Sequence, residues 1–204
     1  FPQYYYEDCV FGVTIENGGK QEYLYLPCDD SAIDRAIHRL GTDSVNNVGL
    51  ENIDSGFVPI SVDQFLTGIC PNYDNTDIYG LNKLASAVTE FSKSDFEKLL
   101  AVCDYAETND FGKTALLAEN LDSFEYAEGA QDTDGLGKYL IKESGSYSYD
   151  DALDDYYDYE ALGADTESNQ NGRFTSYGYV GIKDDVTLDE ILGEESDEMT
   201  MGGM

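Results

Sequence analysis

The first part of the chain alternates apolar and polar positions with a period of two. In VFGVTIENGGKQEYLYL (10–26), apolar or aromatic side chains recur at every second position on both sides of Asn-Gly-Gly at 17–19. That tripeptide suits the positive φ angles of a tight turn between strands. The pattern predicts a β-hairpin, and VGLENIDSGFV (48–58) has the composition of a third strand.

Helical periodicity appears between and after these strands. In SAIDRAIHRLG (31–41), Ser31 stands at the position of an N-cap. Residues 61–106 contain further helical patterns, SVDQFL, LNKLASAVTEF and SDFEKLLAVCDYA, and Ser94 and Glu97 have the spacing of a capping box for the last of them. The core positions predicted for these helices are Ile33, Ala36, Ile37, Leu40, Leu81, Leu84, Ala85, Val88, Phe96, Leu99, Leu100 and Cys103.

The last part of the chain mixes the two periods. Residues 107–193 contain short helical pieces and RFTSYGYVGI (173–182), whose β-branched and aromatic residues indicate a strand. The sequence therefore predicts an α+β protein with three small domains: an N-terminal antiparallel sheet with a helix (1–59), a central helical domain (60–106) and an acidic mixed domain (107–193). The acidic tail, 194–204, is expected to be disordered.

Acidic residues greatly outnumber basic ones. The chain has 42 Asp and Glu against 11 Lys and Arg, a formal net charge of −31, and residues 121–204 hold 22 of the acids and 4 of the bases. Such a field repels nucleic acid and anionic membranes and attracts basic partners. Because there is also no apolar run long enough to span a bilayer, we expect neither nucleic-acid binding nor membrane insertion.

Little in the sequence indicates catalysis or a metal centre. The four cysteines are widely spaced without a CxxC pair, and the single histidine, His38, is expected on a solvent-facing helix surface. No nucleophile–base pair stands out, so we expect neither an enzyme nor a cofactor. The start of the chain, FPQYYYEDC, has no basic signal sequence, and we therefore expect a cytoplasmic protein with reduced thiols.

The segment DDALDDYYDYEALG (150–163) combines six carboxylates with three tyrosines and no positive charge. On a helix, its aspartates fall in one stripe, while Leu153, Tyr156 and Tyr157 face the other way. Repulsion costs about 0.2–0.5 kcal/mol per like-charged pair, whereas burying one aromatic ring returns about 1.5–3 kcal/mol. Packed tyrosines are therefore predicted to hold a fixed row of carboxylates, and such a row resembles a row of phosphates. The candidate phosphate-mimicking residues are Asp151, Asp154, Asp155, Asp158 and Asp165, with Glu119, Asp122, Glu125, Glu128, Asp132 and Asp134 upstream.

Other interpretations fit parts of the sequence. DTDGLGKYLIKE (132–143) has Asp132, Asp134 and Glu143 at positions one, three and twelve of a calcium loop, but Leu136 stands where an oxygen ligand is needed. The charge also suits a binding protein for other basic DNA-binding partners, or an acidic enzyme from a halophile. The plainest interpretation of the acids is a solvated, solubilising face.

Several segments, taken in order along the chain, resemble the ArdA antirestriction family. LNKLASAVTEFSKSDFEKLLAV resembles that family's central helical region, and GLGKYLIKESGSY followed by DDYYDYEALGAD resembles its C-terminal region. GRFTSYGYVGI is similar to its closing strand and VFGVTIENGGKQEYLYLP to its opening hairpin. The resemblance covers roughly residues 10–183, and the order of the motifs carries it rather than any single motif.

The resemblance implies a specific function and shape. ArdA proteins, which plasmids and conjugative transposons carry, mimic bent B-form DNA. They occupy the DNA-binding groove on the methyltransferase core of type I restriction–modification enzymes and so protect incoming DNA. The resemblance further implies an elongated α+β molecule without a catalytic site or cofactor, and a homodimer formed through the C-terminal region. It would make the acids substitutes for phosphates and the tyrosines their supports. The chain departs from the family in a longer loop at 41–58 and an extra acidic tail.

Overall fold

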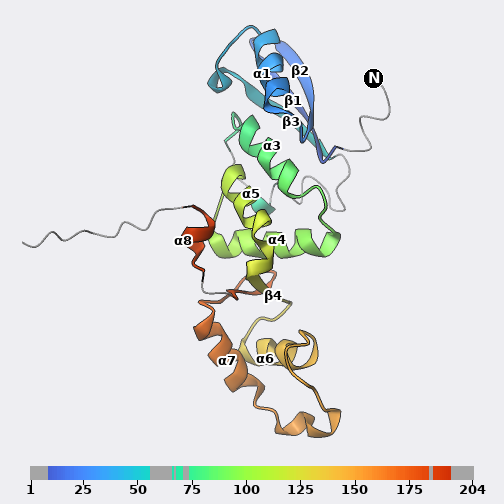
Figure 1. The fold of residues 1–204 in the computed structure, drawn as a ribbon, viewed down its shortest axis with the longest axis vertical. Coiled ribbons are helices and arrows are strands. Elements are labelled where there is room, and N and C mark those ends of the chain that lie inside the picture. Colours follow the sequence, from blue (N-terminus) through green and yellow to red (C-terminus); the bar gives the residue numbers. More distant parts are fainter. Residues whose placement is uncertain (1–8, 56–65, 67, 71–73, 184–185, 194–204) are drawn as a thin grey trace, which may run out of the picture.

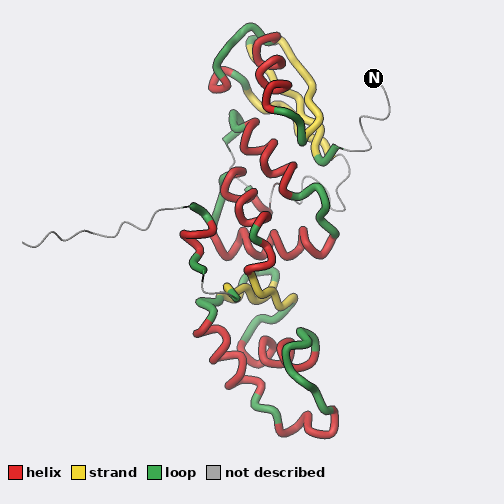
Figure 2. The backbone as a smooth tube through the Cα atoms, in the orientation of Figure 1, coloured by secondary structure: helices red, strands yellow, loops and turns green. Residues whose placement is uncertain are grey.

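The molecule is elongated, and the chain runs along the long axis from the first sheet to a helix pair at the far end before it turns back toward the middle (Figure 1). The computed structural model describes the 204-residue chain except for residues 1–8, 56–65, 67, 71–73, 184–185 and 194–204. An antiparallel sheet lies at one end, helices occupy the middle, and a second small sheet leads to a helix pair at the other end (Figure 2). The α+β class is therefore confirmed. The predicted tail and nearly all of the predicted helix SVDQFL lie outside the described residues.

The N-terminal sheet has the order β2-β1-β3, with both pairs antiparallel. Its strands are β1 (Phe11–Asn17), β2 (Lys20–Leu26) and β3 (Gly49–Ser55). Phe11, Val13 and Ile15 are fully buried on one face of β1. Gly18 and Gly19, at φ 59° and 82°, close the hairpin. The alternating pattern and the turn signal thus predicted this sheet correctly, including its third strand.

The first helix, α1 (Asp30–Arg39), packs against the sheet through the predicted apolar stripe. Its start differs from the prediction, because Asp29 rather than Ser31 is the N-cap residue and its side chain makes no capping hydrogen bond. His38 is exposed on this helix, as expected. A short 3₁₀ turn at Val45–Asn47 connects α1 to β3.

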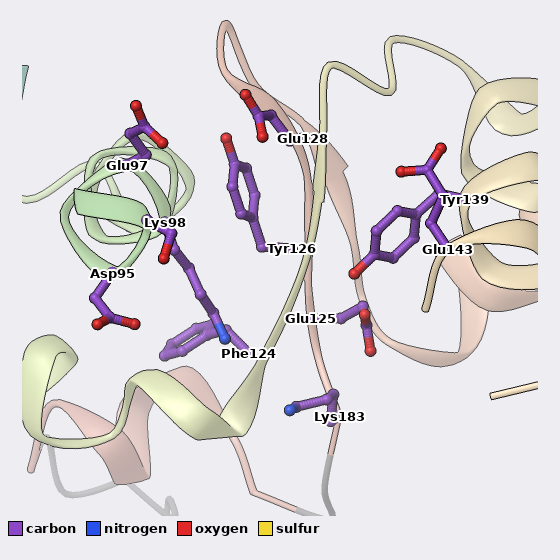
Figure 3. A pocket seen from close by; sticks show the side chains of 11 residues that line it. Asp95, Glu97, Lys98, Phe124, Glu125, Tyr126, Glu128, Tyr139, Glu143 and Lys183 are labelled. Atoms are coloured by element: carbon purple, nitrogen blue, oxygen red, sulfur yellow. The ribbon is translucent and has the colours of Figure 1, made fainter. Parts of the chain in front are cut away.

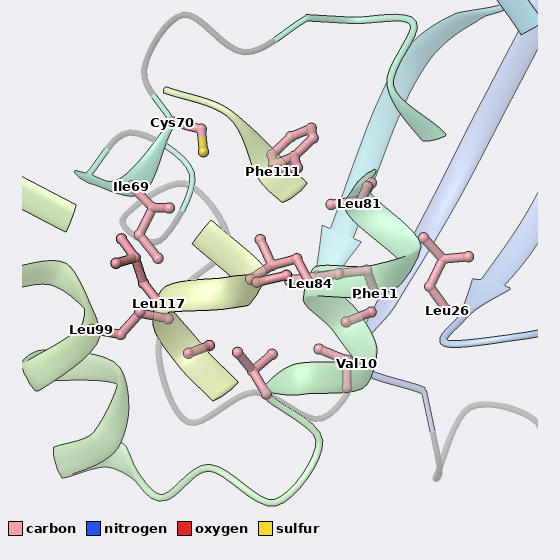
Figure 4. Close-up of a cluster of buried hydrophobic side chains, with 14 of the residues drawn as sticks. Val10, Phe11, Leu26, Ile69, Cys70, Leu81, Leu84, Leu99, Phe111 and Leu117 are labelled. Carbon is pink, nitrogen blue, oxygen red and sulfur yellow. The ribbon is translucent and has the colours of Figure 1, made fainter. Parts of the chain in front are cut away.

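Helices in the middle of the molecule pack their apolar faces together. They are α3 (Ile78–Ala87), α4 (Lys93–Ala106) and α5 (Phe111–Glu119). Leu81 and Leu84 of α3 and Phe111 and Leu117 of α5 belong to the same cluster of buried side chains as Phe11 of the first sheet (Figure 4). One continuous cluster of buried side chains therefore crosses the boundary predicted near residue 60, and the division into three domains stays a prediction.

A capping box does close the start of α4, but in a different frame from the predicted one. Ser92 and Asp95 form it reciprocally, in place of Ser94 and Glu97. The reason lies one residue upstream, where the ring of Phe91 packs edge-on against Phe96 with a centroid distance of 5.5 Å. A contact between the residue before the N-cap and the fourth helical residue fixes the entry of the chain into a helix, and this contact requires Ser92 as the N-cap.

The second sheet has the order β4-β6-β5. Its strands are β4 (Phe124–Glu128), β5 (Arg173–Phe174) and β6 (Gly178–Ile182), and a 3₁₀ turn at Leu121–Ser123 precedes β4. The single strand predicted at 173–182 is wrong, because the chain turns between Thr175 and Gly178. The Thr175 amide donates to the Gly178 carbonyl at 2.8 Å. Gly178 has φ 144°, and a side chain there would run into the Ala127 carbonyl oxygen of β4.

Arg173 ties this second sheet to the end of α4. Its guanidinium forms an ion pair with Glu107 at 2.6 Å and donates to the carbonyl oxygens of Asp104 and Tyr105. These carbonyls belong to the last turn of the helix, which has no amide partners of its own to satisfy them. Ser176 adds two hydrogen bonds to the Asp104 carboxylate. The C-terminal part of the molecule is therefore anchored to the central helices through the end of α4.

The far end of the molecule is a helix pair, α6 (Thr133–Lys142) and α7 (Tyr159–Asn169), and α8 (Leu188–Ile191) returns beside the central helices (Figure 1). Two glycines let α6 and α7 approach closely. A Cβ atom at Gly137 would lie 1.9 Å from the Tyr159 carbonyl oxygen, and one at Gly163 would lie 1.9 Å from the Thr133 carbonyl oxygen. The backbones therefore touch where they cross.

Candidate partner-binding surface

The acidic segment 150–163 is not one helix, and its aspartates do not form one helical stripe. Residues Asp151–Tyr156 form a 3₁₀ helix, the chain is extended at Tyr157, and α7 starts afresh at Tyr159. The break has a local cause. Asp158 accepts a hydrogen bond from the Ala161 amide and so serves as the N-cap of α7, and an N-cap residue has a non-helical backbone.

Tyrosines do support the aspartates, although by a different arrangement from the predicted packed face. Of the side chains placed opposite the acids, Tyr156 is 84% exposed and Leu153 is 47% exposed. Tyr157 is half-buried, and Tyr159 is the ring that is buried, at 8% exposure. The prediction that Leu153 and Tyr156 pack inward is therefore wrong.

The supporting contacts converge on Asp154. Its Oδ1 atom accepts hydrogen bonds from the hydroxyls of Tyr149 at 2.9 Å and Tyr159 at 2.5 Å, and it lies 2.6 Å from Nζ of Lys142. The ammonium of Lys142 also lies over the rings of Tyr149 and Tyr159, at 5.3 and 5.2 Å from their centroids. We call Lys142, Tyr149, Asp154 and Tyr159 the Asp154 cluster.

The ionisation of these groups reflects the contacts. Hydrogen bonds from Lys142, Tyr159 and Tyr149 lower the pKa of Asp154 to about 2, so its carboxylate stays charged at neutral pH. The bond to Asp154 raises the pKa of Lys142. Desolvation, followed by the bond to Asp154, raises the pKa of Tyr149 to about 12 and also raises that of Tyr159. Both hydroxyls therefore remain donors at neutral pH.

The Asp154 cluster also orders its neighbours. The Tyr149 hydroxyl contacts Asp151 at 3.0 Å as well as Asp154, and the Asp150 amide donates to the hydroxyl of Tyr157 at 3.1 Å. The Tyr157 ring contacts those of Tyr149 and Tyr159 at centroid distances of 5.9 and 5.8 Å, with the ring planes tilted by 35° and 41°. These tilted ring contacts, together with Lys142 of α6 over two of the rings, connect the start of the acidic segment to α6.

Most of the predicted phosphate-mimicking residues point into solvent. Asp134, Asp154 and Glu125 are half-buried. The exposed ones are Asp151, Asp155, Asp158, Asp165, Glu119, Asp122, Glu128 and Asp132. Because Gly163 sits against Thr133, the start of α6 with its aspartates lies beside the part of α7 that carries Asp165. Glu119 and Asp122 lie farther along the molecule, where α5 ends.

The lysines of α6 lie within this acidic region, and each is matched to an aspartate. Lys138 pairs with Asp134 one turn away at 2.5 Å, and Lys142 pairs with Asp154. Both pairs are half-exposed or nearly so. The charges of Asp134 and Asp154 are consequently compensated. Among the described residues, no lysine or arginine forms an ion pair with Asp151, Asp155, Asp158 or Asp165. The last four are the stronger candidates for contact with a basic partner.

An acidic groove of about 410 Å³ opens between α4, β4 and α6 (Figure 3). Its carboxylates come from Asp95, Glu97, Glu125, Glu128 and Glu143. Lys98 and Lys183 also line it, and burial together with the charge of Lys183 lowers the pKa of Lys98. The groove extends the acidic surface from the C-terminal helix pair toward the central helices.

In the part of the chain that the structure describes, nothing supports a metal site. Among the described residues, no group of three or more His, Cys, Asp or Glu side chains is placed to hold a metal ion. The calcium loop considered at 132–143 is instead α6, with Asp132 capping it through the Gly135 amide, and a helix cannot wrap its side chains around a calcium ion. The four cysteines are thiols, and burial raises the pKa of Cys103. No helix in the described ranges is both long and apolar enough to cross a bilayer.

Sequence reasoning missed the supports of this surface. Lys142, Tyr149 and Tyr159 were not predicted, nor were Asp95 and Glu143 in the groove. One signal was present in the sequence, since Tyr149, Asp154 and Tyr159 are spaced by five residues each. That spacing fits no regular helix, and its meaning depends on the break at Tyr157.

Comparison of the sequence with known proteins gives a family match. Residues 19–181 match the family model described as antirestriction protein (ArdA), a range that runs from the first hairpin into β6 and contains the Asp154 cluster. A search of curated proteins found no match to the chain. Proteins of the matched family are inhibitors that act on type I restriction–modification enzymes. Because the match spans most of the sequence, the chain belongs to the ArdA antirestriction family.

Proposed function

We propose that this protein mimics B-form DNA and occupies the DNA-binding groove on the methyltransferase core of a type I restriction–modification enzyme. In this role it protects incoming mobile DNA in the cytoplasm. The observation that carries the proposal is the long acidic body, whose exposed carboxylates continue from α5 to the end of the helix pair. The family match supports the same target.

The physical basis of the mimicry is electrostatic. Duplex DNA presents one negative charge per roughly 1.7 Å of helix axis, and a protein that binds it does so largely by neutralising phosphates. A groove shaped for that charge favours any rigid, elongated and equally signed surface. The eight exposed candidate carboxylates and the acidic groove beside β4 distribute negative charge along the C-terminal half of the molecule.

Rigidity distinguishes this surface from an acidic tail. Flexible carboxylates lose freedom when a partner fixes them, and that loss reduces the free energy gained on binding. Here Asp158 is fixed by its capping bond to the Ala161 amide, and Asp151 by the Tyr149 hydroxyl. Pre-ordered charges of this kind suit the mimicry of a stiff duplex.

The proposal includes a homodimer formed through the C-terminal region. Its support is the set of large hydrophobic side chains that are exposed near the far end of the molecule, since contiguous exposed apolar side chains often mark interfaces. Tyr147, Tyr149, Leu153 and Tyr156 all lie there, between 38% and 84% exposed. A sedimentation measurement of the mass in solution tests the dimer.

Neutralising the exposed aspartates tests where the partner binds. We expect the triple variant Asp151→Asn, Asp155→Asn, Asp158→Asn to lower affinity for a type I methyltransferase by about tenfold, since exposed ion pairs contribute roughly 0.2–1 kcal/mol each. Asparagine is a good N-cap, so the variant at 158 keeps the start of α7. Displacement of labelled DNA from the methyltransferase measures the affinity, and circular dichroism confirms the fold.

A matched variant removes three acids from the other end of the molecule. Asp29→Asn, Asp43→Asn and Glu51→Gln alter exposed residues and change the net charge equally. We expect a much smaller effect from this control. Equal losses in both variants would show that only total charge matters, and no loss in the first would place the partner elsewhere. Tighter binding to a basic nucleoid-type protein than to the methyltransferase would favour the alternative, an acidic binding protein for other basic DNA-binding partners.

A further inference from the structure

Lys142 carries a positive charge within the acidic surface that is proposed to bind the partner. By electrostatic attraction alone, Lys142 should weaken binding, because it cancels the charge of one carboxylate and repels a basic groove. Its contacts indicate otherwise. Its Nζ atom lies 2.6 Å from Asp154 and over two tyrosine rings. The other lysine of α6, Lys138, pairs with Asp134 along the same helix, and its ammonium lies over one ring, that of Tyr159, at the longer distance of 5.9 Å from the centroid.

We propose that Lys142 is a positioning residue for partner binding, which fixes the acidic segment 149–158 against α6 and so strengthens inhibition although it reduces the negative charge. This inference rests on the proposed function for its binding consequence. Its structural half, the ordering of the segment, stands on the contacts alone.

The contacts form a path from Lys142 to the exposed acids. The ammonium on α6 bridges Tyr149 before the 3₁₀ helix, Asp154 within it and Tyr159 after it. From Tyr149 the path continues to Asp151 through the shared hydroxyl. Tyr159 is the first residue of α7, directly after the capping residue Asp158. One side chain thus holds both ends of the segment.

The segment needs such a tie because its own charges oppose order. Asp150, Asp151, Asp154, Asp155 and Asp158 fall within nine residues without a basic residue among them, and like charges this close repel. Few apolar contacts compensate, since Leu153 and Tyr156 are exposed. A cation held between aromatic faces and a carboxylate replaces the missing apolar anchor.

The test compares two substitutions that remove the same charge from the same helix. Lys142→Gln should raise the concentration needed for half-displacement of DNA from the methyltransferase by about tenfold, because carboxylates freed from their supports must be ordered on binding. Lys138→Gln should leave that concentration unchanged or lower it. It increases the negative charge and removes the 5.9 Å contact of Lys138 with the Tyr159 ring, but it leaves the bonds to Asp154 in place. Lys142→Arg should restore wild-type binding, because arginine keeps both the charge and the stacking on rings.

Two further measurements keep the outcomes distinct. Amide ¹⁵N relaxation should show that Lys142→Gln makes residues 149–158 more mobile while the first sheet keeps its order. The double variant Lys142→Gln, Asp154→Asn keeps the net charge of the wild type, so weak binding by it would separate positioning from total charge.

Each result bears on one claim. If Lys142→Gln binds as well as the wild type, or if its segment stays ordered, the positioning role is wrong. If the wild type itself displaces no DNA, the proposed function is wrong, and the relaxation data still decide whether Lys142 orders the segment.

Discussion

At the scale of single residues, the pairing of aspartate with tyrosine has a chemical explanation. A tyrosine hydroxyl is a donor with a flat apolar ring, so it can bind a carboxylate on one side and a cation on its face. Asp154 accepts hydrogen bonds from two such hydroxyls, and the ammonium of Lys142 lies over the faces of the same two rings. The sequence indicated that tyrosines support the acids, but it did not show which ones, because the partners come from α6 and from both sides of a chain break.

The depressed pKa of Asp154 predicts a dependence of stability on pH. Its folded pKa, about 2, lies below its ordinary value of 3.8. The contribution of its ionised form is therefore present at pH above about 4 and is lost as pH falls toward 2. We expect Asp154→Asn to melt at a lower temperature than the wild type at pH 7, and the difference to shrink between pH 4 and pH 2. Thermal melts followed by near-ultraviolet circular dichroism of the tyrosines measure it in dilute solution.

Comparing the Asp154→Asn variant with the wild type controls for the many other carboxylates that titrate in the same pH range. These carboxylates are common to both chains, so their effects cancel in the difference. A difference that stays constant from pH 7 to pH 2 would contradict the assigned role of Asp154.

At the scale of elements, periodicity predicted helices and strands well where apolar packing decides them. The first hairpin, the stripe of α1 and the buried faces of α3 and α4 all follow the sequence pattern. It failed where side chains compete with the backbone. Asp158 ends one helical run by capping the next, and Phe91 selects Ser92 over Ser94 as the cap of α4. Both choices depend on contacts that a single periodic pattern does not contain.

The role of the glycines in the helix pair could not be predicted from the sequence either. Glycine within a helix costs up to about 1 kcal/mol relative to alanine, so Gly137 and Gly163 look unfavourable in isolation. They are explained only by the crossing of α6 and α7, where each lies against a backbone carbonyl of the other helix or its start.

The crossing predicts that alanine at residue 163 destabilises the protein despite its higher helix propensity. The added methyl group of Gly163→Ala would meet the Thr133 carbonyl oxygen, which cannot move without shifting α6. Overpacking of this kind costs about 1–3 kcal/mol, and urea unfolding measures it. Gly49→Ala is the control, because a Cβ atom there has nothing within 4 Å, and we expect a change within about 0.5 kcal/mol. Equal stability of both variants would mean that the helices do not cross as closely as described.

At the scale of the whole molecule, shape and charge act together. Composition alone predicted a basic partner, since a net charge of −31 repels nucleic acid and other acidic partners. The structure adds an elongated body anchored at the end of α4 by Arg173, and it distinguishes exposed carboxylates from those that lysines compensate. That distinction was not available from the sequence, because ion pairs such as the one between Lys142 and Asp154 join residues from different elements.

The measurement that tests the central claim most directly is a competition titration at several salt concentrations. A type I methyltransferase is mixed with labelled target DNA, and this protein is added until the DNA is released. Electrostatic mimicry predicts complete displacement at low salt, with a half-displacement concentration that rises steeply as salt increases. A folded protein that releases no DNA at low salt would contradict the account and would leave the acidic surface without its proposed partner.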